Sequence, residues 1–152
     1  MENDQTGKDA MMVVAELDAV HERARLAYAR RDARAYIDTL DPSLEYTQLD
    51  GRTVGVEQLA RDVRVQLARM HRAETEFHRE ALETDQEVGR AIETLEQRAT
   101  FQVRMFGFIA REWTVRRRGR YEWLRTTDGW KLRRVHVLSE EVLPPRTWIA
   151  FR

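Results

Sequence analysis

The sequence contains no cysteine, which excludes disulfides, thiolate nucleophiles and cysteine-ligated metal sites. It also lacks any apolar run near the roughly 18 residues that a membrane-spanning helix needs, and its first residues contain no apolar signal core. The sequence therefore predicts a cytoplasmic protein without membrane contact. Charge of one sign is not in excess either, because 26 basic residues balance 26 acidic ones. Such a chain is not expected to bind nucleic acid.

No linker, internal repeat or low-complexity stretch divides the 152 residues. This length matches one domain, and 42% hydrophobic with 34% charged residues is typical of a globular chain. We expect residues 1–10 to form a disordered lead-in, residues 11–143 a single domain, and residues 144–152 an apolar C-terminal tail. The tail is expected to fold over a pocket mouth or onto a second subunit.

Three helical segments are predicted in the first half of the chain. Apolar residues recur at helical spacing over residues 11–28. A short second helix is expected over residues 32–40, where Asp32 can cap it and Pro42 requires it to end. The most regular apolar pattern predicts a third helix over residues 56–70.

Beyond the third helix the apolar period changes from 3.6 to 2, which predicts antiparallel strands. Residues 91–105 and 109–123 each alternate between apolar and polar side chains, as half-buried strands do. Asp128-Gly129 is a strong hairpin signal. The strand that follows, over residues 130–143, is apolar on both faces and is expected to be covered on both sides.

Three local signatures in this order of elements support a family resemblance. They are Arg31-Asp32-Ala33 before Tyr36-Ile37, Leu44-Glu45-Tyr46 with Asp50-Gly51-Arg52 and Gly55, and Tyr121-Glu122-Trp123 followed by Asp128-Gly129-Trp130-Lys131-Leu132 and a strand ending at Ser139. Over residues 11–143 the chain thus resembles the nuclear transport factor 2-like superfamily, in its SnoaL-like branch. The resemblance implies an α+β cone, with three N-terminal helical segments packed on a strongly curved antiparallel sheet and an apolar pocket at the wide end.

The resemblance leaves the activity open, because the superfamily holds isomerases, cyclases, hydrolases, dehydratases and binding modules. One hypothesis is a small-molecule-binding protein that takes a small apolar or aromatic ligand and works as a cyclase- or isomerase-like enzyme without a cofactor. The other is a non-catalytic homodimeric interaction module whose pocket is filled by its own side chains. Members often dimerise through the outer face of the sheet, so the resemblance implies a homodimer of this kind.

His136 and Arg134 are the candidate catalytic residues. On a regular strand they share a face with Trp130, Leu132 and Leu138. If that face lines the pocket, His136 can act as a general acid or base, and Arg134 can hold a carboxylate or phenolate. The alternative is that His136 is hydrogen-bonded in the core and Arg134 is paired with a glutamate.

The candidate ligand-binding residues are aromatic or amide side chains expected on the cavity wall or its rim. They are Tyr28, Tyr46, Gln48, Trp113, Tyr121, Trp123 and Trp130. Aromatic walls suit a flat apolar ligand, and Tyr28 can donate a hydrogen bond to an oxyanion. The alternative for each aromatic residue is ordinary core packing.

Several specific chemistries find no support in the residues. Ketosteroid isomerase chemistry needs a carboxylate base on the first strand, where this chain has Tyr46, Thr47 and Gln48, and Arg25 falls near the family's first-helix tyrosine position. Cyclases of the SnoaL type use a pocket aspartate, which the inward-facing strand positions lack. The four histidines show no metal-binding spacing, so no metal site is expected.

Alternate arginines of one strand are predicted to form a row on the outer face: Arg116, Arg118 and Arg120. This row is expected to face solvent or a dimer partner and to be balanced by Glu112 and Glu122. The orientation of Arg117 stays open, because Gly119 can introduce a bulge that shifts the phase of the strand.

Overall fold

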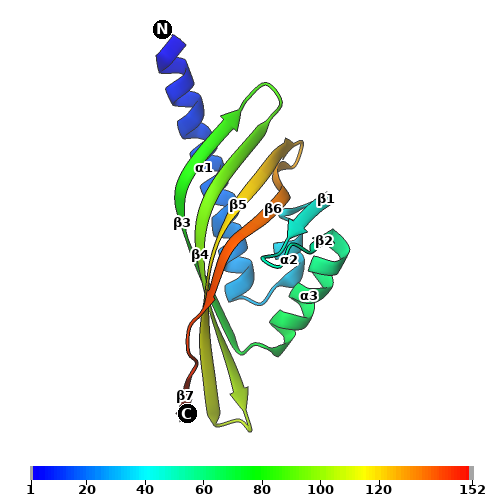
Figure 1. Cartoon of the computed structure of the whole chain (residues 1–152), viewed down its shortest axis with the longest axis vertical. Helices are drawn as coiled ribbons and strands as arrows, with labels where there is room; N and C mark the ends of the chain where they lie inside the picture. Colours follow the sequence, from blue (N-terminus) through cyan, green and yellow to red (C-terminus); the bar gives the residue numbers. More distant parts are fainter. Residues whose placement is uncertain (1, 151–152) are drawn as a thin grey trace.

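The computed structural model describes residues 2–150, with side chains over residues 4–150. In chain order its elements are α1 (Glu2–Ala29), α2 (Ala33–Ile37), β1 (Leu40–Thr47), β2 (Thr53–Gly55), α3 (Val56–Arg69), β3 (Arg72–Asp85), β4 (Arg90–Met105), β5 (Ile109–Thr126), β6 (Gly129–Val142) and β7 (Arg146–Ile149). Figure 1 shows a long twisted sheet with the three helices gathered beside it. The predicted α+β fold, with helices packed on a curved, mainly antiparallel sheet, is confirmed.

The sheet has the strand order β2-β1-β6-β5-β4-β3. Strand β7 pairs with the first residues of β5, 109–112. All pairs are antiparallel except β1 and β6, which run parallel. The long strands β3 to β6 are successive hairpins, so the alternation in their sequence sets one inner and one outer face. The inner face packs against the helices and the outer face carries charged side chains.

Helix α1 begins earlier than the sequence predicted, because residues 2–10 are helical and not a disordered lead-in. Pairs of side chains four residues apart support this first part of the helix, since they lie on one face. Lys8 is 3.5 Å from Asp4, and the Gln5 amide donates to Asp9 at 3.2 Å. Met1 lies outside the described residues. Among residues 2–150, no helix combines the length and apolar character needed to cross a lipid bilayer.

Two bulges interrupt β6. Trp123 pairs with Leu132 but Glu122 pairs with Arg134, so Arg133 is an extra residue in the strand. Leu138 is a second extra residue, between the partners of Arg118 and Gly119. Each bulge changes which face the following side chains occupy, because side chains alternate strictly only along a regular strand.

The C-terminal segment forms β7 along the β4–β5 hairpin, with Ile149 opposite Ile109. The prediction that this tail folds over the cavity mouth is therefore wrong. Its backbone pairs with β5 instead. Trp148 and Ile149 remain 37% and 58% exposed. The third apolar tail residue, Phe151, lies outside the described residues.

Candidate functional site

A cavity of about 820 Å³ lies between the inner face of the sheet and the three helices. Six of the seven predicted ligand-binding residues line it: Tyr28, Tyr46, Gln48, Trp113, Tyr121 and Trp123. They come from α1, β1 with its following turn, and β5, which the fold brings together around one space. Apolar side chains such as Phe77 and Phe101 complete the wall.

Trp130 does not line the cavity. It is 4% exposed within the core beneath α1, where its Nε1 donates to Glu16 at 2.6 Å. The guanidinium of Arg125 stacks on its ring at 4.8 Å. Trp130 thus joins α1 to the start of β6 and packs in the core, as the alternative interpretation held.

The predicted catalytic residues, His136 and Arg134, lie on the outer face of the sheet. Both are exposed, and neither lines the cavity. The expectation that they share a face with Leu132 is wrong, because the bulge at Arg133 places Val135 on the inner face and turns its neighbours outward. Arg134 lies 3.4 Å from Glu45 and 3.6 Å from Glu122, the glutamate pairing that the alternative interpretation expected.

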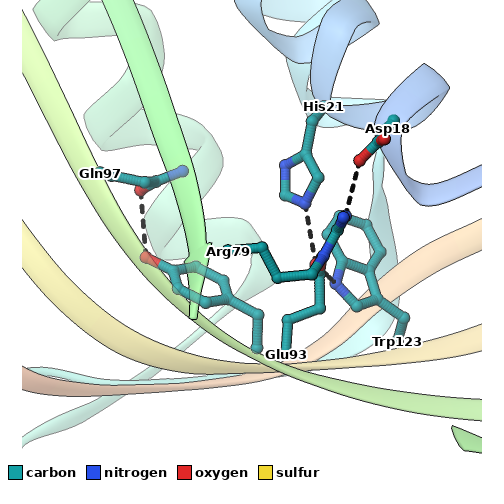
Figure 2. A network of polar contacts seen from close by, with 7 residues as sticks. Asp18, His21, Arg79, Glu93, Gln97 and Trp123 are labelled. Carbon is teal, nitrogen blue, oxygen red and sulfur yellow. Dashed lines mark hydrogen bonds and ion pairs between the residues drawn. The ribbon is translucent and has the colours of Figure 1, made fainter. Parts of the chain in front are cut away.

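A buried carboxylate that the sequence analysis missed lies directly behind the cavity wall. Glu93 of β4 is 0% exposed and accepts hydrogen bonds from Arg79 at 2.7 Å and from Trp123 Nε1 at 2.7 Å. Its Oε1 is 2.8 Å from Nε2 of His21. Asp18 binds the other end of the Arg79 guanidinium at 2.7 Å. Figure 2 shows Asp18 and His21 reaching from α1 toward this group on the sheet.

Glu93 is held in its ionised form. Burial alone would raise the pKa of its carboxyl, but the hydrogen bonds from His21 and Arg79 and the positive charge of Arg79 outweigh burial and lower the pKa below its ordinary value. The pKa of Arg79 is raised, since its bonds to Asp18 and Glu93 outweigh the opposing effect of burial. A carboxylate with several partners in a buried site has a fixed position, which makes it a suitable support for a catalytic side chain.

His21 connects this network to the cavity. It is 6% exposed and lines the cavity wall, with its ring 4.2 Å from that of Phe77 and 5.4 Å from that of Trp123. Because ionised Glu93 can only accept, the hydrogen bond assigns the proton of neutral His21 to Nε2. Within residues 4–150, Nδ1 makes no hydrogen bond, and no buried side-chain nitrogen or oxygen there lacks a partner. Nδ1 is therefore accessible from the cavity.

A second polar cluster lies in the same cavity. Arg117 of β5 points inward, which answers the question that the sequence left open. Its Nη1 donates to the hydroxyl of Tyr46 at 2.8 Å, and its Nε donates to Glu140 at 2.9 Å. The hydroxyl of Tyr121 donates to Gln97 at 3.0 Å.

All four tyrosines of the chain are neutral phenols at neutral pH. Burial raises the pKa of Tyr28 to about 12 and also raises the pKa values of Tyr36, Tyr46 and Tyr121. The rings of Tyr28 and Tyr36 meet edge to face at 4.8 Å. The cavity therefore offers several hydroxyl donors in an apolar surrounding, where hydrogen bonds are stronger than in water.

The arginines on either side of Arg117 point away from the cavity. Arg118 pairs with Glu80 at 2.7 Å, and Arg116 binds Glu141, all on the outer face. Their partners come from β3 and β6, whereas the sequence predicted Glu112 and Glu122. Among the described residues, no group of three or more histidine or acidic side chains could hold a metal ion.

No family model and no curated protein matches this sequence. Solved structures do match its fold. A putative scytalone dehydratase from Novosphingobium aromaticivorans is 6% identical over 89% of this chain and 90% of its own, with a TM-score of 0.73. A hexachlorocyclohexane dehydrochlorinase, LinA-type3 of Novosphingobium barchaimii, is 12% identical over 90% of this chain and 94% of its own, with a TM-score of 0.63.

A third structure carries a family name. It is a putative dehydratase of the nuclear transport factor 2-like family from Streptomyces avermitilis, 14% identical over 82% of this chain and 94% of its own, with a TM-score of 0.61. At identities this low, similarity to a solved structure indicates the fold alone. The function therefore has to be inferred from the residues of the cavity.

Proposed function

Given that the chain has the nuclear transport factor 2-like fold that its sequence predicted, we propose that it binds a small, largely apolar molecule in the cavity and transfers a proton on it. His21 is the general acid and base, and Glu93 holds it in place. No cofactor takes part. The observation that carries the proposal is the 2.8 Å contact between the buried Glu93 and Nε2 of His21, a residue that lines the cavity.

The roles follow from the chemistry of the two side chains. Glu93 fixes the tautomer in which Nδ1 is unprotonated and can accept a proton. When Nδ1 takes a proton, the negative charge of Glu93 stabilises the imidazolium that forms. Arg79 and Trp123 hold the carboxylate, and Phe77 restricts rotation of the imidazole.

The reaction class that fits is an elimination or an isomerisation started by removal of a C–H proton. The proton passes to Nδ1 of His21, and the electrons of the C–H bond form a double bond. In an elimination a leaving group departs with its bonding electrons, and His21 returns the proton to it or to water. Two fold neighbours are named as a dehydratase and a dehydrochlorinase, which supports this class.

Native mass spectrometry of freshly purified protein identifies any retained small molecule, and deuterium exchange then tests the chemistry. In D₂O, the wild-type protein is expected to exchange the acidic hydrogen of that molecule, whereas His21→Gln is expected to slow exchange by about 10²-fold or more. His136→Gln, on the outer face, is the matched control and should exchange at the wild-type rate. Equal rates in His21→Gln and wild type would refute the assignment.

The second candidate is a non-catalytic homodimeric interaction module. The observation that favours a homodimer is Leu138, an apolar side chain of β6 that is 39% exposed. The open cavity of about 820 Å³ favours ligand binding over a pocket filled by its own side chains. A dimer that Leu138→Glu dissociates, together with no bound molecule and no exchange, would favour the module.

A further inference from the structure

Arg117 occupies an unusual position for a cation, on the inner face of the sheet at the wall of a cavity that both aromatic and polar side chains line. Its side chain is 34% exposed, and it is held by Tyr46 on one side and Glu140 on the other. A guanidinium has five N–H donors. Nη1 and Nη2 each carry a second N–H beyond the one directed at Tyr46 or Glu140, so at least two donors remain for a ligand.

One tyrosine hydroxyl, that of Tyr46, contacts this guanidinium, and three further tyrosines line the same cavity. Tyr46 accepts from Arg117, so its own proton is free to be donated to a ligand. Among the described residues, the hydroxyls of Tyr28 and Tyr36 make no hydrogen bond, yet no buried polar side-chain atom lacks a partner. These two hydroxyls are therefore accessible from the cavity. All four tyrosines line the same cavity as Arg117.

We infer that Arg117, with the hydroxyls of Tyr46 and Tyr28, forms an anion-binding subsite, and that the ligand of this cavity carries an anionic oxygen group such as a carboxylate. The inference rests on the proposed small-molecule function of the cavity. A guanidinium fork beside phenolic donors matches the several lone pairs of such a group, and the apolar walls strengthen each contact. An uncharged oxygen group would accept weaker hydrogen bonds from these N–H groups than an anionic one.

Glu140 then acts as a competitor for the subsite. Its carboxylate occupies the Nε side of Arg117 at 2.9 Å, and its side chain is 32% exposed at the end of β6. A ligand carboxylate approaching the same guanidinium meets repulsion from this charge. Removing the charge of Glu140 should therefore tighten binding of an anion, while removing Arg117 should weaken it.

Two fluorescent probes with the same ring system separate charge from shape. 8-Anilinonaphthalene-1-sulfonate carries an anionic oxygen group, and N-phenyl-1-naphthylamine lacks it. Binding of each is titrated by fluorescence to the folded wild-type protein and to Arg117→Gln, Arg117→Lys and Glu140→Gln, with circular dichroism confirming the fold. The matched control is Arg111→Gln, because Arg111 lines a separate apolar cavity of about 410 Å³ beside Val142.

The expected result is that Arg117→Gln weakens sulfonate binding about tenfold or more and changes binding of the neutral probe less than about twofold. Arg117→Lys should fall between wild type and Arg117→Gln because it keeps the charge and loses the fork. Glu140→Gln should tighten the sulfonate severalfold. If Arg117→Gln does not fold, this opposite effect of Glu140→Gln still tests the subsite.

Other outcomes overturn the inference and identify which premise fails. If the neutral probe binds the wild type and the sulfonate is insensitive to both Arg117 and Glu140, the cavity binds molecules but the subsite does not exist. If Arg111→Gln alone weakens the sulfonate, the anion binds in the other cavity. If neither probe binds the wild type, the proposed small-molecule function itself fails, and the subsite with it.

Discussion

His21 and Glu93 are 72 positions apart in the chain, and a 2.8 Å contact joins them behind the cavity wall. The contact connects α1 to β4, the strand beside the edge strand β3. It also links the proposed catalytic role of His21 to stability, because the carboxylate that contacts His21 is fully buried and also accepts hydrogen bonds from Arg79 and Trp123. A network of this kind is stable only when it is complete.

Replacing Glu93 with alanine is expected to lower the free energy of unfolding by about 3–5 kcal/mol, because it leaves Arg79 and the Trp123 N–H without their buried partner. Urea denaturation followed by circular dichroism measures the change. Glu96→Ala is the matched control on the same strand, since Glu96 is on the outer face and lies 3.7 Å from Arg116. It should cost less than about 1 kcal/mol. Similar losses in both variants would contradict the network.

The stability of the protein should fall in acid in a way that depends on Glu93. Its folded-state pKa lies below that of an unfolded glutamate, which is about 4.3. The stabilisation it contributes is therefore complete above that pH and is lost as the pH falls through the lower folded value. Denaturation midpoints measured from about pH 6 down to 3 should decline less steeply in Glu93→Gln than in wild type. If the midpoints of Glu93→Gln and wild type declined equally steeply with falling pH, the acid sensitivity would not come from Glu93.

The tyrosines should resist ionisation in the native protein. Tyr28 has a pKa of about 12, and burial raises the pKa of the other three above the ordinary value of about 10. Ultraviolet titration should show little tyrosinate at about pH 10 in the native state and ordinary ionisation in denaturant. Because the folded pKa values are the higher ones, stability should fall as the pH rises beyond about 10. Half-ionised tyrosine at that pH with a native circular dichroism spectrum would refute the burial of this cluster.

Gly119 should tolerate no side chain. A Cβ at this position would lie 3.0 Å from the backbone oxygen of His136 and 3.2 Å from the Tyr121 ring. Gly119→Ala is expected to cost about 1–3 kcal/mol, because strand β6 or the ring must shift. Gly7→Ala is the control, since its Cβ meets nothing within 4 Å and alanine favours a helix. An unchanged unfolding midpoint in Gly119→Ala would show that β6 yields easily there.

Regular elements of this fold are predictable from sequence. The period of 3.6 places α3 within a residue of its observed end at Arg69, and alternation along β5 puts Trp113, Tyr121 and Trp123 on one inner face. These elements are predictable because packing and local periodicity agree in them. In β4 the same alternation predicts an apolar side chain at position 93, where the sequence has Glu93. This polar residue at an inward-facing position is the feature of the sequence that indicates the buried site.

The interruptions of regularity explain the errors. In β6 the apolar residues change from even positions, at Trp130 and Leu132, to odd ones, at Val135 and Val137. This change predicted a strand that is apolar on both faces, whereas in the structure it marks the bulge at Arg133. The local sequence does not distinguish a regular strand that is apolar on both faces from a bulged strand, because a bulge depends on the pairing with the partner strand. The contact of His21 with Glu93 depends on tertiary packing and has no local signature.

The parallel pairing of β1 with β6 also bears on how the chain is made. Tyr46 pairs with Val135, so β1 is synthesised long before the strand that pairs with it. Glu93 is likewise synthesised before its partner Trp123, whereas its other partner, His21, precedes it in the chain. Vectorial synthesis thus gives a long period with an incomplete sheet and an uncovered apolar edge. Folding that depends on such distant pairings is slow, and this interval is when the nascent chain has most need of chaperones.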